Sequence, residues 1–172
     1  MVPVFKAPTG WTFTGSSAIT PFKMNATIEG SVIFKGEISV NTGGDLDVVD
    51  ITGDVDRHVR KSGVSDGVVN IFVAGSTAAL TTIEFEPGAV DDLKGALSRL
   101  APRDMDYAHN AAWGDGNGHS HVRAALLGPD ITVPVRDGTP LLGTWQQIIL
   151  VEFDTRSRSR TLYLTVLGEK SL

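Results

Sequence analysis

Short apolar segments separated by turn residues constrain the fold of this chain more than any other feature. RTLYLTVLG (160–168) alternates, so that Leu162, Leu164 and Val166 share one face of a strand. GVVNIFVAG (67–75) is a short run of Val, Ile and Phe that is typical of a buried strand. Further extended segments are predicted in GEISV (36–40), DLDVVDIT (45–52), LTTIEFE (80–86), DITVPV (130–135) and LLGTWQQIILVEF (141–153). Asp137-Gly138 favours a tight hairpin turn.

Helices are expected to interrupt these strands. Thr52 is the predicted N-cap of the first, in which Ile51, Val55 and Val59 form one apolar stripe before Gly63. Because strands dominate, we predict an α+β fold with a mostly antiparallel sheet, or two-layer sandwich, and a few short helices. Two more helices are predicted, one opened by Pro87 with its buried side formed by Val90, Leu93, Leu97 and Leu100, and one from about Ser120 to Leu127 that Gly128 ends.

The length of 172 residues suits one domain, which we place at residues 34–172. Residues 1–33 have no acidic residue before Glu29, and we predict an N-terminal appendage that is extended or partly disordered. The net charge of −5 argues against a nucleic-acid partner. No apolar run approaches the roughly 18 residues of a membrane span. The lack of cysteine excludes disulfides and thiolate metal sites, and a cytoplasmic location is expected.

The segment YAHNAAWGDGNGHSHVRAALLGP (107–129) holds three of the four histidines, His109, His119 and His121. Three imidazoles with acidic neighbours can bind a divalent metal such as Mg²⁺ or Zn²⁺. Alternatively, one imidazole acts as an acid or base while the others, with Asn117 between them, bind an anion. A third interpretation is a polar loop whose histidines form only local hydrogen bonds.

Hydroxyl and carboxylate groups follow the strand GVVNIFVAG. Ser76 and Thr77 come directly after it, where hydroxyls and free backbone N–H groups can hold a phosphate. An ordinary turn explains the same residues. Glu84 alternates with Ile83 and Phe85, so its carboxylate faces either a site or solvent.

Two further stretches carry groups suited to a ligand. If TRSRSR (155–160) is extended, Arg156, Arg158 and Arg160 point the same way and can bind phosphates or the carboxylates of a partner. A solvated hairpin turn is the alternative. Trp145 and Gln146 begin the longest predicted strand, where an aromatic ring beside an amide can form a wall for a flat ligand, although a core tryptophan is the commoner outcome.

Several short motifs in order resemble the YjbQ-like family, which is often labelled secondary thiamine-phosphate synthase. The resemblance runs from about Lys35 to Glu169, and it implies an α+β sandwich-like fold. It also implies a homotrimer with a site close to the subunit interfaces, and a weak activity that joins a pyrimidine diphosphate to a thiazole phosphate. The motifs are DIT (50–52), STAALTTIE (76–84), YAH (107–109), NGHSH (117–121), LLG (126–128), VPV and DG (133–138), LGTWQ (142–146) and the closing arginine-rich strand.

The resemblance also assigns site residues. The residues that match the family's pattern are Glu84, Asp92, His109 and His121, which are the catalytic candidates, together with Trp145 and Gln146. The chemistry and spacing of the residues add Ser76, Thr77, Asn117, Arg158 and Arg160, which with Trp145 and Gln146 are the ligand-binding candidates, and the metal-ligand candidates His109, His119 and His121. One position departs from the pattern, because many members carry a histidine where this chain has Gly75. We hypothesise that His119 takes over the role of that imidazole.

Three functions follow from these residues. In an enzyme, Arg158, Arg160, an imidazolium or Mg²⁺ would stabilise departing pyrophosphate, with Glu84 or Asp92 holding the metal and His109 or His121 donating a proton. The alternatives are a non-catalytic trimeric binder of a phosphorylated metabolite or divalent metal, and a purely structural trimer. The sequence has no P-loop, dinucleotide fingerprint or Ser-His-Asp arrangement that would force an enzymatic function.

Overall fold

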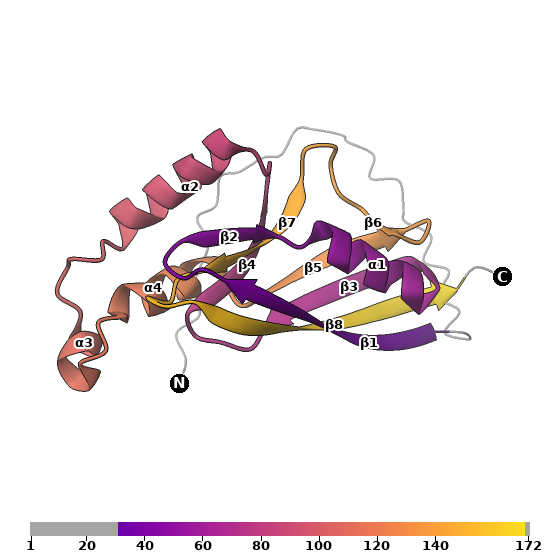
Figure 1. The fold of residues 1–172 in the computed structure, drawn as a ribbon. Coiled ribbons are helices and arrows are strands. Elements are labelled where there is room, and N and C mark those ends of the chain that lie inside the picture. Colours follow the sequence, from indigo (N-terminus) through magenta and orange to yellow (C-terminus); the bar gives the residue numbers. More distant parts are fainter. Residues whose placement is uncertain (1–30, 171–172) are drawn as a thin grey trace, which may run out of the picture.

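Two antiparallel sheets form the centre of the protein, whose computed structural model describes residues 31–170 (Figure 1). The predicted α+β fold, mostly antiparallel with a few short helices, is confirmed. One sheet has the strand order β1 (Ser31–Thr42), β8 (Arg158–Lys170), β3 (Val64–Val73), β5 (Asp130–Arg136) and β6 (Thr139–Pro140). The other has the order β2 (Asp47–Asp50), β7 (Gln147–Glu152) and β4 (Ala78–Ile83).

The main hydrophobic core contains side chains from both sheets. The predicted alternation in β8 is confirmed, because Leu162, Leu164 and Val166 are all fully buried in this core. Helix α1 (Thr52–Ser62) contacts strands of both sheets and adds the predicted apolar stripe, including Val55 and Val59. The helix ends as predicted at Gly63, which adopts a left-handed conformation with φ of 70°.

Strand β7 is buried on both faces, which explains its unbroken apolar run. Alternate residues of this strand enter the main core and a second core on the opposite face of the three-stranded sheet. Helices α2 (Pro87–Leu100) and α4 (Gly118–Leu127) cover that second face (Figure 1). The buried members of the second core are Ala79, Ile149 and Val151 from the sheet, Phe153 directly after β7, Leu97 from α2 and Ala124 from α4.

Local predictions differ from the structure at two helix ends. Thr52 is the first residue of α1 rather than its N-cap, because its hydroxyl instead accepts a hydrogen bond from the Ile148 N–H at 2.8 Å. Leu100 is 70% exposed and not on the buried side of α2. The chain leaves the helix at Ala101, which is fully buried in place of Leu100.

Strand boundaries and one short helix also differ. Residues 141–146 are not part of β7, which begins only at Gln147, and α3 (Ala108–Trp113) forms where a loop was predicted. Ser31–Ile33 belong to β1, and the rest of the predicted N-terminal appendage lies outside the described residues. Within the described part of the chain, no helix is long and apolar enough to cross a membrane.

We expect Gly168→Ala in β8 to destabilise the protein by roughly 1–3 kcal/mol, because its new methyl group would overlap the backbone of the neighbouring β3 strand at Asp66 and Gly67. Gly53→Ala is the matched control, since no atom lies within 4 Å of a Cβ at that helical position. It should be neutral or stabilising by up to about 1 kcal/mol. Urea denaturation of both variants gives the comparison, and equal stability would contradict this account of the β3–β8 contact.

Candidate functional site

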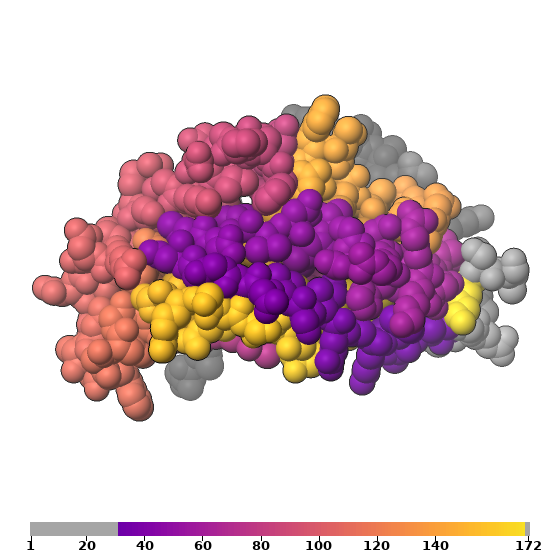
Figure 2. All heavy atoms as spheres, in the orientation of Figure 1, coloured from indigo at the N-terminus to yellow at the C-terminus, as the bar shows by residue number. Residues whose placement is uncertain are grey.

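One cleft brings together most of the predicted ligand-binding residues. It has a volume of about 630 Å³ and lies between the α3–α4 segment and the start of β8. Figure 2 shows the two segments in contact, the first in salmon and the second in yellow. We call this site the histidine–arginine cleft. One wall carries His109, Trp113, Asp115, Asn117 and His121, and the other carries Ser76, Thr77, Asp154, Arg158 and Arg160.

The histidine wall is built around a carboxylate. The ring centroids of His109 and His121 are 4.4 Å apart, with an angle of 57° between the ring planes. Nε2 of His109 lies 3.3 Å from Oδ2 of Asp115. With its amide nitrogen turned toward Asp115, Asn117 donates to the two carboxylate oxygens at 3.0 and 3.2 Å. Asp115 therefore fixes the His109 ring on one side, which leaves Nδ1 of that ring for a ligand.

Glycine residues allow this wall to close. Gly114 ends α3 in a left-handed conformation with φ of 70°, so the chain reverses toward α4. The Gly118 N–H donates to Oδ1 of Asn110 at 2.8 Å. A Cβ at Gly118 would lie 2.5 Å from Cβ of Tyr107, so only glycine fits this close contact between the two helices.

Arg160 in the opposite wall is held by a buried carboxylate. Its Nε donates to Oε2 of Glu152 at 2.6 Å and its Nη2 to Oε1 at 2.5 Å. Glu152 is fully buried, and it also accepts hydrogen bonds from the Thr42 hydroxyl and the Asp154 N–H. Nη1 of Arg160 has no hydrogen-bond partner among residues 31–170, and it lies 2.8 Å from the place of a Cβ on Gly75. The absence of a side chain at Gly75 therefore leaves this nitrogen open to the cleft.

Arg158 makes a second forked ion pair beside the first. Its Nε and Nη2 donate to Oδ2 of Asp154 at 2.9 and 2.7 Å. Burial raises the pKa of Asp154, but hydrogen bonds and charge from Arg158, with hydrogen bonds from the Arg156 N–H and the Thr77 hydroxyl, hold that pKa below its ordinary value. Each arginine is thus paired with a carboxylate and retains its Nη1 group, with two N–H donors, for an anion.

The two predicted hydroxyl residues have different roles. The Thr77 hydroxyl is buried, accepts from Nη2 of Arg160 at 2.8 Å and donates to Asp154 at 3.2 Å. Ser76 is exposed, and its hydroxyl has no partner in the described part of the chain. Thr77 therefore supports the arginines, whereas Ser76 is free to contact a ligand.

His119 does not join the other two histidines. It is fully buried, its Nδ1 has no hydrogen-bond partner, and its Nε2 lies 3.4 Å from the Ser120 hydroxyl. Burial lowers the pKa of His119, and the charge of Arg123 lowers it further. Beside Gly75 the structure places Arg160, so the hypothesis that His119 replaces an imidazole there finds no support in this geometry.

The predicted set of three histidine metal ligands is not assembled. Within residues 31–170, no three histidine, aspartate or glutamate side chains are grouped so that they could hold a metal ion. The donor set within residues 31–170 does not fit a resident metal in a single chain.

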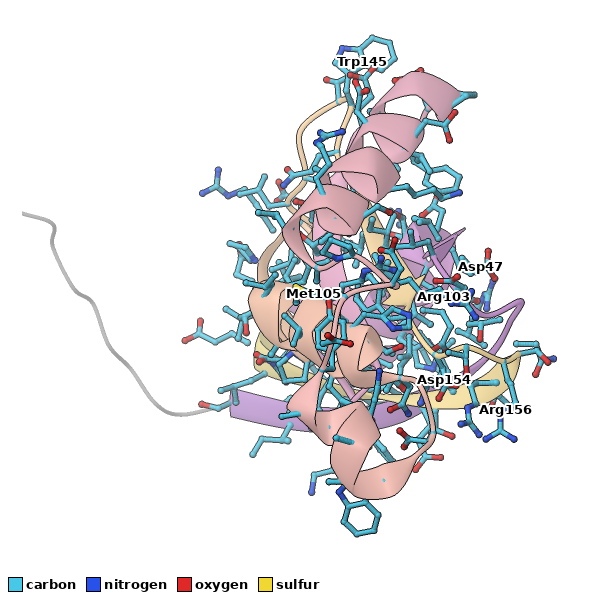
Figure 3. All side chains as sticks on the ribbon, turned by 90° about the vertical axis from the view of Figure 1, so that its left-hand side faces the viewer. Asp47, Arg103, Met105, Trp145, Asp154 and Arg156 are labelled. Carbon is cyan, nitrogen blue, oxygen red and sulfur yellow. The ribbon has the colours of Figure 1, made fainter. Side chains whose placement is uncertain are left out.

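Glu84, Asp92, Trp145 and Gln146 lie outside the cleft. Strand β4 begins next to Thr77 and runs away from the cleft, antiparallel to β7. Glu84, which follows β4, and Gln146, which precedes β7, therefore both lie at the far end of this strand pair. Six residues at about 3.4 Å each separate the two ends by roughly 20 Å. Trp145 is 71% exposed and is not a core residue, and Figure 3 shows it far from Asp154. The Gln146 amide donates to the Thr82 hydroxyl at 3.0 Å.

Two carboxylates that line the cleft, Asp115 and Asp154, and the buried Glu152 behind Arg160 were not among the predicted site residues. Asp115 lies inside the histidine-rich segment, and its position between two glycines was a usable signal. Glu152 and Asp154 directly follow the apolar run of β7 and precede TRSRSR. An acidic residue at the end of a buried strand, close in sequence to several arginines, indicates a buried ion pair.

Comparison with known proteins gives consistent similarities. Residues 36–169 match the family model described as UPF0047 protein YjbQ-like. A UPF0047 protein of Methanothermobacter thermautotrophicus is 36% identical over 137 residues, which cover 80% of this chain and 94% of that protein. The crystal structure of a YbjQ-like protein of unknown function from Sulfolobus solfataricus P2 is 37% identical with a TM-score of 0.77, covering 81% of this chain and 99% of that one. A conserved hypothetical protein from Thermus thermophilus is 31% identical with a TM-score of 0.66, and the match covers 76% of this chain and 98% of that one.

We expect Glu152→Gln to cost roughly 3–5 kcal/mol of unfolding free energy, because it leaves the charge of Arg160 uncompensated at a site where that side chain is only 12% exposed. Asp56→Asn removes the exposed ion pair with Arg60 and should cost less than about 1 kcal/mol. Chemical denaturation measures the unfolding free energy of both variants. A loss for Glu152→Gln no greater than for Asp56→Asn would show that the buried pair does not stabilise the fold.

We also expect acid to destabilise the wild type more than His119→Phe. The pKa of His119 is below its ordinary value of 6.5 in the folded state, so as the pH falls below about 6.5 the unfolded chain binds a proton that the folded chain does not. The contribution of neutral His119 to the free energy of unfolding is fully present above about pH 6.5, and it is lost as the pH falls toward the lowered pKa of the folded state. Thermal melting from about pH 7.5 to 5 tests this, and identical pH profiles would refute it.

Proposed function

The chain belongs to the UPF0047 YjbQ-like family, and we propose that its histidine–arginine cleft binds a small phosphorylated molecule and assists the departure of pyrophosphate from it. The activity implied by the resemblance, thiamine-phosphate synthesis, is the specific reaction proposed. The observation that carries the proposal is the presence of two forked arginines, each with a free Nη1 group, opposite a histidine hydrogen-bonded to a carboxylate.

The arginines suit a phosphorylated ligand because their geometry is fixed in advance. Arg158 and Arg160 each use Nε and Nη2 to bind a buried carboxylate, so the guanidinium planes are held before a ligand arrives. Donors fixed in this way need little reorganisation as negative charge develops on a leaving group. Because Asp154 and Glu152 balance both positive charges, the attraction is local and short-ranged, which agrees with the acidic net charge of the chain.

The arginines and His109 have separate roles in the proposed reaction. The thiazole nitrogen forms a bond to the methylene carbon of the pyrimidine, and the bond from that carbon to the diphosphate oxygen breaks, which releases pyrophosphate. The Nη1 groups of Arg158 and Arg160 stabilise the charge that develops on the pyrophosphate. His109 in its imidazolium form keeps its Nε2–H on Asp115, lies against His121 and donates its Nδ1 proton to the diphosphate oxygen that leaves the carbon, which makes the ring neutral.

The remaining predictions concern the residues outside the cleft. Glu84, Asp92, Trp145 and Gln146 would reach a cleft of this type only from a neighbouring copy, so their proposed participation depends on the homotrimer that the resemblance implies. A divalent metal such as Mg²⁺ or Zn²⁺ likewise stays a prediction, and assays with and without each ion test it.

We expect His109→Ala to lower turnover of the two thiamine precursors by about 10²- to 10⁴-fold, while pyrophosphate affinity, measured by calorimetry, changes by no more than about threefold because the arginines remain. Arg158→Met should instead weaken pyrophosphate binding by about tenfold or more. His58→Gln is the matched control, since His58 lies on α1 and bonds the Asp54 carbonyl outside the cleft.

Three outcomes separate the functions. Loss of turnover in His109→Ala with normal behaviour of His58→Gln supports the enzyme. Pyrophosphate binding that depends on Arg158, without turnover in any protein, identifies a non-catalytic binder. Binding and turnover that are unaffected by either cleft variant would overturn the assignment of this site.

A further inference from the structure

A second, apolar cavity adjoins the histidine–arginine cleft. It has a volume of about 280 Å³ and shares Gly75, Ser76 and His121 with the cleft. We call it the alanine pocket, because Ala78, Ala124 and Ala125 line the rest of it together with Pro129. No charged side chain lines it, which contrasts with the two arginines and two aspartates of the cleft.

The fold fixes the pocket from three sides. Ala78 begins β4 and is buried in the main core, whereas Ala124 lies on α4 and is buried where that helix packs against the sheet. The Leu80 N–H donates to the Gly128 carbonyl at 3.1 Å, which ties the end of α4 to β4. The Val73 N–H donates to the Pro129 carbonyl at 2.8 Å, which ties the next residue to β3. Rigid elements therefore hold the walls, and the short alanine side chains leave the space between them open.

The boundary between the two cavities carries polar groups without partners. Neither the Ser76 hydroxyl nor the two ring nitrogens of His121 form a hydrogen bond within residues 31–170. Both side chains lie on the wall that the cavities share. A molecule that extends from one cavity into the other would pass these donors and acceptors, which could bind its central oxygen or ring nitrogen.

We propose that the alanine pocket binds a single uncharged aromatic ring of a ligand whose phosphate occupies the histidine–arginine cleft. An apolar cavity of about 150 Å³ holds benzene, so 280 Å³ has room for one ring with small substituents. The apolar wall excludes a charged group, since no ionic partner faces it. This inference rests on the proposed function for the position of the phosphate, and it adds the place at which the aromatic ring of the ligand binds.

Benzyl phosphate, methyl phosphate and benzyl alcohol separate the two cavities in a calorimetric binding experiment. The wild type should bind benzyl phosphate about tenfold or more tightly than methyl phosphate, because only the former places a ring in the pocket. Ala125→Leu should remove that preference by filling the pocket, and leave methyl phosphate affinity within about twofold. Ala125 is exposed, so the larger side chain does not displace the core.

Val122→Leu is the matched control, because it enlarges an exposed residue of the same helix that does not line the pocket. It should bind all three probes as the wild type does, and thermal melting should show both variants folded. An unchanged preference for benzyl phosphate in folded Ala125→Leu would overturn the ring pocket. Binding of benzyl alcohol that Ala125→Leu abolishes, without binding of either phosphate, would support the pocket and overturn the phosphate cleft. Binding of no probe would overturn both.

Discussion

The buried ion pair between Glu152 and Arg160 is the interaction on which the rest of the structure depends. Glu152 ends β7 in the three-stranded sheet, whereas Arg160 lies in β8 of the five-stranded sheet, so the pair joins the two sheets directly. Thr42 from β1 and Thr77 before β4 complete the network by hydrogen bonds. A carboxylate removed from water is tolerated only when its oxygens are satisfied in this way. The same guanidinium forms a wall of the cleft, so the contact that holds the sheets together also positions the candidate anion donor.

Apolar packing positions the opposite wall. Helix α4 is fixed on the three-stranded sheet by Ala124 and by partly buried Leu127, and His121 is therefore carried on a packed helix. His109 lies on the short helix α3, which has no buried residue and is placed instead by the contact of His109 with Asp115 and by the hydrogen bond from the Gly118 N–H to Asn110. The site thus combines one histidine on a rigid element with one whose position depends on polar contacts. A ligand that contacts both would order the α3 segment most.

The sequence was sufficient for features that local periodicity determines. The alternation in β8, the turn at Asp137-Gly138 and the stripe of α1 needed no knowledge of distant partners. Helix α3 was missed because its six residues lack an apolar stripe. Most of the residues that line the cleft were among the predicted site residues, but the sequence did not show which predicted residues lie outside it. Thr77 and Glu84 are separated only by β4, and the direction of that strand, which tertiary pairing sets, places them at opposite ends of the sheet.

The missing side chain at Gly75 links two positions that are far apart in sequence. A Cβ there would lie 2.8 Å from Nη1 of Arg160, closer than van der Waals contact, so a larger residue at position 75 and an arginine at position 160 compete for one volume. Because Nη1 is the far end of a flexible side chain, a larger residue at position 75 requires that end of the guanidinium to move. The glycine therefore sets how far Nη1 of Arg160 reaches into the cleft, and a side chain in its place would present its own group to a ligand beside the guanidinium.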